Sequence, residues 1–251
     1  MNILKEIINK ADLNIELVWV PPGTFMMGSP ESETNRWFEE KLHSVTFTKG
    51  LWIAKFPVTQ ALWTKIMGNN PSWFQAGKSV VPCGVNTDDY PVESVSWNDI
   101  CNSGGFLEKL NAATGKMFRL PTEAEAEYAR RAGTITKYYW GDQIDGDYCW
   151  YNRNSENSIH PVGQKRPNAW GLYDMGGGVY EWCSDWYDSN YYAVSPAEDP
   201  SGPASGTRRV LRGMGWNGVD VNFRSAYRCY YSPSDSYYSL GFRVVLDSIC
   251  Q

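Results

Sequence analysis

The sequence predicts a single α+β domain with small antiparallel sheets, two or three helices and much irregular structure. Apolar residues make up 42% of the 251 residues, which is enough for a core. Short runs rich in β-branched and aromatic residues are separated by Pro, Gly and Asn, as is typical of strands joined by turns. Three segments carry helix capping signals, whereas the chain after Gly133 is rich in glycine, asparagine and aromatic residues and has few periodic segments.

The expected strands are short. The segment LVWVPPGTFMM, residues 17–27, has strand character broken by Pro-Pro-Gly, which predicts two strands around a turn. Further strands are expected at residues 44–48, 51–56, 178–182, 209–213 and 241–246.

Each expected helix is recognised from its capping residues. Thr59 precedes QALWTKIM, and Ser96 precedes a segment that runs to about Asn111 but contains an unfavourable Gly-Gly pair. The clearest helix follows Thr122 and Glu125, which form a capping box ahead of its apolar positions.

Charge and hydropathy exclude two classes of partner. The net charge is −5 and no run of Lys or Arg occurs, so we expect no nucleic acid partner. No apolar stretch approaches the length needed to span a membrane. We expect residues 1–16 to form an N-terminal extension, residues 17–251 to form one domain with a variable region at about 210–246, and the chain to be a monomer.

Six widely spaced cysteines and two histidines do not form a zinc pattern. There is no CxxC pair, and His43 and His160 are distant in sequence. Up to three disulfides are compatible with the even number of cysteines. For a chain able to build its own core, we expect mostly buried free thiols.

Residues 217–239 have an unusual composition. They read NGVDVNFRSAYRCYYSPSDSYYS, with five tyrosines, five serines and two aspartates, and no Lys, Glu, Gln, Met or Trp. Tyrosine supplies large contact area at low entropic cost, and serine supplies adaptable hydrogen bonds, so this composition favours a binding surface. The alternative is a surface loop that binds nothing.

Several motifs in register resemble the formylglycine-generating-enzyme (sulfatase-modifying factor) domain family. They are WVPPGTFMMGS, FPVTQALWTKIMG, PVESVSWNDI, FRLPTEAEAEYARRAG, NAWGLYDMGGGVYEWCSDWY, RVLRGMGW and LGFRVV, and they cover residues 17–246. The resemblance implies a variant of the C-type lectin fold, with little regular secondary structure, a small antiparallel sheet and two helices packed against it.

Enzymes of that family oxidise a substrate cysteine with a pair of active-site cysteines. Here Gly218 stands where the first of these cysteines aligns, and no cysteine follows until Cys229. Another branch uses a three-histidine iron site, which two distant histidines do not supply. We therefore expect no catalytic residues and no required cofactor, with a formylglycine-generating-type oxidase as the alternative.

The segment RVLRGMGWNGVDVNFRSAYRCYYSPSDSYYSLGFRVV also resembles the variable region of proteins diversified by retroelements, in which adenine-specific mutagenesis acts on asparagine codons. Fixed positions of that pattern coincide with Trp216, Arg224, Ser225, Ala226, Arg228, Pro233, Gly241, Phe242 and Arg243. Thirteen positions are asparagine in that pattern and are called the slots below. Here they hold residue types that changes of the adenines in an Asn codon can produce. Lys, Glu, Gln, Met and Trp, which are absent from the segment, cannot be produced in this way. The expected ligand-binding residues are the residues at these slots together with Asn217 and Asn222. This variable set consists of Asn217, Gly218, Val219, Val221, Asn222, Tyr227, Cys229, Tyr230, Tyr231, Ser232, Ser234, Asp235, Tyr237, Tyr238 and Ser239.

The segment YDMGGGVYEW resembles a calcium-binding turn of the family. The resemblance implies a structural calcium held by the side chains of Asp174 and Glu181 and the carbonyls of Gly177 and Val179. The alternative is a glycine-rich turn in which Glu181 bonds backbone groups beside Trp182.

Other conspicuous residues have structural explanations. Trp216 is expected to be a core anchor beneath the binding face, and Arg224, Arg228 and Arg243 to hold loops through bidentate bonds. The glutamates of EAEAE suit the N-terminus of a helix better than an acidic catalytic cluster.

The sequence thus predicts a catalytically inactive ligand-binding protein with a retroelement-diversified face. A protein or cell-surface molecule is the expected partner. The resemblance implies a cell-surface or secreted location, with a cytoplasmic location as the alternative. An unvaried structural interaction domain is a further alternative function.

Overall fold

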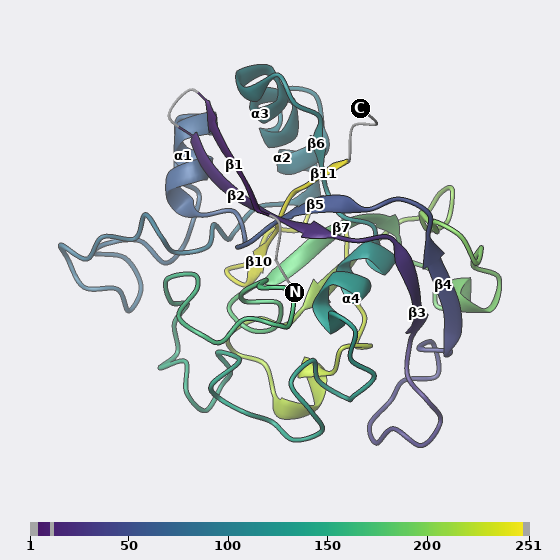
Figure 1. Cartoon of the computed structure of the whole chain (residues 1–251). Helices are drawn as coiled ribbons and strands as arrows, with labels where there is room; N and C mark the ends of the chain where they lie inside the picture. The colour runs from purple at the N-terminus through teal and green to yellow at the C-terminus, as the bar shows by residue number, and fades with distance from the viewer. Residues whose placement is uncertain (1–4, 11–12, 248–251) are drawn as a thin grey trace.

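The largest sheet is antiparallel and joins the two ends of the chain. The computed structural model describes residues 5–10 and 13–247. This sheet has the strand order β1-β2-β5-β11-β6, so the first strands lie close to the last one (Figure 1). Its strands are β1 (Lys5–Lys10), β2 (Leu13–Val20), β5 (Leu51–Ala54), β11 (Val245–Asp247) and β6 (Phe118–Arg119).

A second sheet of four strands carries the segment of unusual composition. Its order is β10-β7-β8-β9, and β10 is parallel to β7 while the other pairs are antiparallel. The strands are β10 (Leu240–Gly241), β7 (Tyr180–Trp186), β8 (Arg209–Gly213) and β9 (Cys229–Tyr231). A separate hairpin pairs β3 (Gly23–Met27) with β4 (His43–Phe47).

The helices of the described residues are short. The α-helices are α1 (Gln60–Met67), α2 (Trp97–Cys101), α3 (Phe106–Thr114) and α4 (Glu123–Arg131). Two 3₁₀ turns, η1 (Tyr191–Ala193) and η2 (Asp220–Phe223), complete them. Within the described residues, no helix has both the length and the apolar character required to cross a bilayer.

The capping residues confirm the predicted helix starts. The Thr59 side chain accepts the amide of Leu62, and Thr122 and Glu125 form the predicted capping box. The single helix expected from Ser96 is instead two helices. Gly104, between them, has a φ of 76°, a left-handed conformation that interrupts a helix.

The expected N-terminal extension over residues 1–16 is wrong from Lys5 onward. Residues Lys5–Lys10 pair with β2 as an antiparallel strand. Strand β2 itself begins at Leu13, and the side chains of Leu13 and Ile15 are buried in the core. The apolar residues Leu13, Ile15 and Leu17 alternate with polar ones, which is the period of a strand with one buried face. The domain therefore begins before residue 17.

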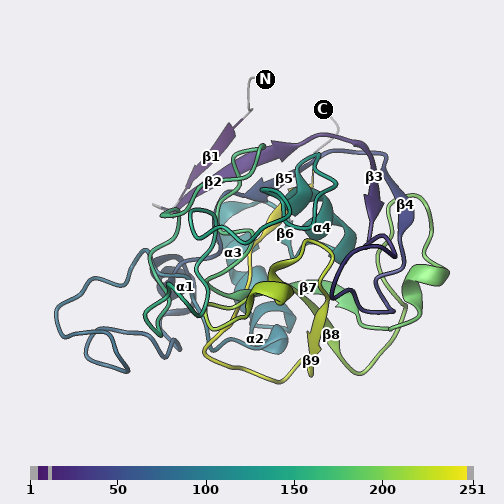
Figure 2. The same cartoon turned by 90° about the horizontal axis from the view of Figure 1, so that it is seen from below.

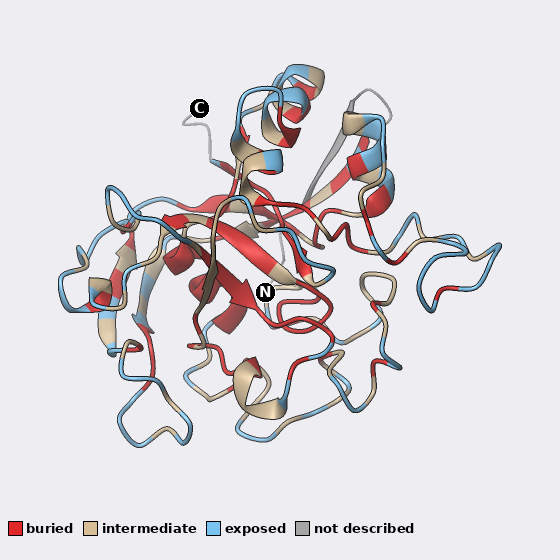
Figure 3. Ribbon diagram, turned by 180° about the vertical axis from the view of Figure 1, so that it is seen from behind, coloured by how far each residue is buried: buried red, intermediate tan, exposed pale blue. Residues whose placement is uncertain are grey.

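Helix α4 is the central support of the fold. All of its residues are buried, and it contacts β3, β7 and β8. Figure 3 shows the buried strands at the centre, surrounded by loops whose residues are mostly exposed or half-buried. The predicted α+β class with small sheets and extensive irregular structure is confirmed.

Candidate ligand-binding face

Residues 217–239 connect two strands of the four-stranded sheet. The chain leaves β8, passes through η2, pairs with β8 again as the edge strand β9, and reaches β10 at the opposite edge of the sheet. Seen from below, η2 and β9 lie on the outside of the molecule (Figure 2). A rigid sheet therefore holds both ends of the segment.

Burial within this segment follows the division between fixed positions and slots. The fixed positions are buried with one exception, Pro233, which is half-buried. The variable set is accessible apart from Gly218. Its exposed members are Asn217, Val219, Ser234, Tyr237 and Tyr238, and its half-buried members are Val221, Asn222, Tyr227, Cys229, Tyr230, Tyr231, Ser232, Asp235 and Ser239.

Gly218 corrects the expected binding set. It is buried, and a Cβ added to it would clash with the Met214 side chain. The backbone of Gly218 bonds to Asn152, so this position supports the loop instead of presenting a side chain to a ligand. A larger residue at this slot requires both the Met214 side chain and the Phe223 ring to move.

The tyrosines of the variable set lie on two sides of β9. Side chains alternate across a strand, so Tyr230 points away from Tyr231. The Tyr230 ring lies 4.0 Å from that of Tyr187, with the guanidinium of Arg208 4.7 Å from its centroid. The Tyr231 ring lies 5.2 Å from that of Tyr237. A third group is formed by Tyr238, whose ring lies 6.0 Å from that of Trp216, so these tyrosines belong to three separate aromatic groups.

Burial raises the pKa values of two groups of the face, Tyr227 and Cys229. Burial raises the pKa of Tyr227 to about 12, and the Tyr180 hydroxyl is hydrogen-bonded to it. Burial also raises the pKa of the Cys229 thiol to about 11. A thiol that stays protonated is a poor nucleophile, so Cys229 is suited to contact and not to covalent catalysis.

Three buried arginines hold the fixed positions, as predicted. Arg224 bonds both carboxylate oxygens of Glu40 at 2.5 and 2.6 Å, and Arg228 bonds both oxygens of Glu123 at 2.6 and 2.8 Å. Arg243 forms the same fork with Glu181 at 2.7 and 2.8 Å. Bidentate bonds of this kind fix orientation as well as distance.

The α4 glutamates have a larger role than the one predicted for them at the helix N-terminus. Beyond the helix N-terminus, Glu123 and Glu127 are buried partners of Arg212, at 3.2 and 2.6 Å. Glu127 also bonds Arg131 at 2.8 Å. The alternation of glutamate and alanine in this helix indicates a helix that is packed on all sides. It does not indicate which arginines pair with the glutamates.

The predicted calcium turn does not suit a cation. Both oxygens of Glu181 bond Arg243, whose charge already occupies that position. The Asp174 carboxylate accepts the amide of Gly163 at 2.7 Å, and burial raises its pKa to about 6. The carbonyl of Gly177 accepts the amide of Val179 at 3.1 Å. The alternative of a glycine-rich turn fits better, with an arginine in place of the backbone groups expected around Glu181.

The described part of the chain holds neither a disulfide nor a cluster of metal-ligating side chains. Its five cysteines are free thiols. No group of three or more His, Cys, Asp or Glu side chains is placed there to hold a metal ion.

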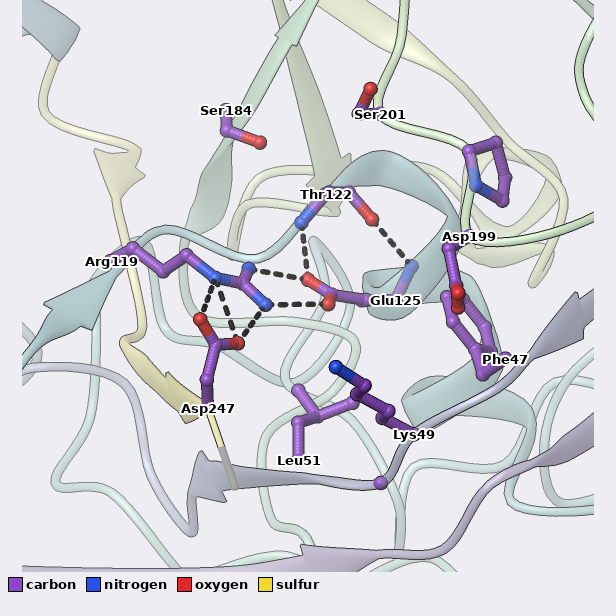
Figure 4. Close-up of a pocket in the computed structure, with 12 residues that line it drawn as sticks. Phe47, Lys49, Leu51, Arg119, Thr122, Glu125, Ser184, Asp199, Ser201 and Asp247 are labelled. Atoms are coloured by element: carbon purple, nitrogen blue, oxygen red, sulfur yellow. Dashed lines mark hydrogen bonds and ion pairs between the residues drawn. The ribbon is translucent and has the colours of Figure 1, made fainter. Parts of the chain in front are cut away.

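A pocket of about 510 Å³, with several charged side chains in its lining, lies apart from the variable set, and none of its lining residues belongs to that set. Arg119 is held there between Glu125 and Asp247 (Figure 4). Asp199 accepts the amide and hydroxyl of Thr48. Arg119, Glu125 and Asp247 are bonded to one another, and no residue of the variable set lines this pocket, so it is not the preferred site.

Residues 6–248 match the family described as sulfatase-modifying factor enzyme 1-like domain. The chain belongs to this family. As a sulfatase-modifying-factor domain, it is 38% identical over 177 residues to the formylglycine-generating enzyme of Streptomyces coelicolor, covering 64% of this chain. It spans 54% of that enzyme, about half its length.

Two solved structures match this sulfatase-modifying-factor domain over nearly its whole length. Treponema denticola variable protein 1 has a TM-score of 0.84 and 28% identity, covering 99% of this chain and 100% of its own. PvdO from Pseudomonas aeruginosa has a TM-score of 0.81 and 29% identity, covering 98% of both chains. The expected C-type-lectin-like fold and the resemblance to a variable protein are confirmed.

Stability of the domain is expected to fall as pH rises from about 4.5 to 7. Burial raises the pKa of Glu93 from 4.5 to about 7, so the folded state binds a proton that the unfolded state has released. Glu93→Gln removes this group. At pH 8 the variant should be more stable than the wild type by up to about 3 kcal/mol, and at pH 4 equally stable. Urea unfolding at both pH values measures the difference, and a constant difference would contradict the assignment.

Proposed function

We propose that this domain binds ligands through the accessible members of the variable set and has no catalytic activity. One observation supports this most: twelve of the thirteen asparagine slots, all but Gly218, are accessible, whereas the fixed positions are buried, with Pro233 half-buried. A loop that binds nothing has no reason to show this division together with a tyrosine- and serine-rich composition.

The proposed mechanism is comparable to that of an antibody. The buried arginine forks hold the backbone of the segment, and the side chains at the slots set which partner is bound. Retroelement mutagenesis supplies the variation, as the resemblance to Treponema denticola variable protein 1 supports.

The proposed partner is a protein or a cell-surface molecule. Tyrosine-rich faces provide rigid contact area with a polar tip, which suits protein surfaces. We place the domain at the cell surface or in secreted form, where such a face meets foreign molecules. A monomer is sufficient, because residues 217–239 form the face within one chain.

The genome sequence tests the diversification directly. We expect a nearby second copy of the DNA for residues 217–239 that carries asparagine codons at the thirteen slots, and sibling strains that differ at those slots. Identical residues at all slots in sibling strains would instead support an unvaried structural interaction domain.

The competing function is oxidation of a peptide cysteine, since the relatives include formylglycine-generating enzymes. We expect a copper titration to show no stoichiometric binding and a cysteine-containing peptide to remain unmodified. The physical reason is that Gly218 supplies no thiolate and the Cys229 thiol is protonated. Stoichiometric copper binding with peptide turnover would contradict the proposal.

A further inference from the structure

A hollow of about 330 Å³ opens beside the variable set and is built mainly from residues outside it. Four aromatic rings and two small polar side chains line it, namely Trp73, Phe74, Trp216, Tyr238, Ser79 and Asn157. Tyr238 alone among these residues belongs to the variable set. The hollow therefore keeps most of its walls when the slots change.

The inner walls are rigid. Phe74 is 2% exposed and Trp216 is 9% exposed, and their rings meet edge to face at 5.6 Å. The Phe74 amide donates to the buried Glu93 carboxylate at 2.9 Å, and the Trp216 amide donates to the Gly178 carbonyl at 2.9 Å. A preformed pocket binds with little loss of conformational entropy.

The outer walls are accessible. Trp73 is 56% exposed, and Tyr238, at 45%, lies 6.0 Å from Trp216 between ring centroids. The hollow is thus open to solvent and continuous with the proposed face through Tyr238.

The chemistry of the lining favours an apolar occupant. No lining residue is charged. Its hydrogen-bonding side-chain groups are those of Ser79 and Asn157, the Tyr238 hydroxyl and the indole N–H groups of the two tryptophans, and that of Trp216 is buried without a partner. A sugar ring would stack on the aromatic walls but would find few side chains there to orient its hydroxyls. The volume lies at the lower end of the range of about 300–1,000 Å³ for ligand pockets, which suits one side chain of a larger partner.

We propose that this hollow is a constant anchor pocket that receives one apolar side chain, preferably aromatic, from a protein partner. This proposal rests on the proposed function of the variable set. The residues at the surrounding slots would determine which partner is bound, and the residue at slot 238 would change one wall of the pocket. Partners bound by different variants of the domain would share an apolar anchor residue, as buried aromatic anchors commonly dominate interfaces.

Titration with N-acetyl-tryptophanamide, followed by the indole N–H signals of the intact chain, tests the pocket. We expect the Trp73 and Trp216 signals to shift. Trp37 is the matched control, since it is 54% exposed but does not line the hollow, and its signal should stay in place. Trp73→Ala and Tyr238→Ala should each weaken binding about tenfold. Phe38→Ala, at an exposed aromatic residue outside both the hollow and the variable set, should leave it unchanged.

Absence of Trp73 and Trp216 shifts up to the solubility limit of the probe would overturn the proposal, as would equal shifts at Trp37. Methyl glucoside binding in place of the indole probe would assign the hollow to sugars and also overturn it. A result that contradicts the anchor pocket does not contradict the ligand-binding face. The face is tested separately by exchanging the slots between variants, which does not depend on this probe.

Discussion

Replacing Arg228 with alanine is expected to lower the free energy of unfolding by about 3–5 kcal/mol. Arg228 is buried and bonds both oxygens of Glu123 at 2.6 and 2.8 Å. Without it, the Glu123 carboxylate keeps one bond to Arg212 at 3.2 Å and loses its closest counter-charge in a dry environment. Urea unfolding measures the change.

The matched control is Arg153→Ala. Arg153 also pairs with a carboxylate, that of Asp220 at 3.2 Å, but its side chain is largely exposed. Exposed pairs contribute less than about 1 kcal/mol. An equal decrease in the free energy of unfolding in the two variants would contradict the claim that burial makes the Arg228–Glu123 pair more stabilising than an exposed pair.

Replacing Trp216 with alanine should also cost about 3–5 kcal/mol of stability, because it removes a large buried side chain. Trp216 belongs to a buried cluster with Phe74 and Val179. Its neighbour Tyr238 occupies a slot and is exposed, so Tyr238→Ala should cost less than about 1 kcal/mol.

The comparison of Trp216 with Tyr238 tests the division between fixed positions and slots. Both side chains are aromatic, lie in contact and line the same hollow, so the difference in cost reflects burial. A loss for Tyr238→Ala as large as that for Trp216→Ala would mean that the slot residue is part of the core.

Features set by local interactions were predictable from the sequence. Thr59 and Thr122 each bond a backbone amide three residues later, so their caps are visible in a short window of sequence. The segment 217–239 was identified from its composition and from the order of its motifs, and its accessible tyrosines are where that pattern placed them.

Features that depend on distant partners were not predictable in detail. Glu123 and Arg228 are 105 positions apart, and Glu40 and Arg224 are 184 apart. The sequence shows that these charges exist but not which of them pair, because the pairing follows from the packing of α4 and the loops. The burial of Gly218 under Met214 is likewise a consequence of tertiary packing.

Exchange of slot residues between two selected variants tests the central claim most directly. A library of this chain, diversified only at the thirteen slots, would be selected for binding to two unrelated proteins. The residues at the slots of each variant would then be transferred to the other. We expect binding specificity to move with the slots while both chains remain folded. Specificity that stays with the recipient chain after all slots are exchanged would contradict a recognition face formed by these residues.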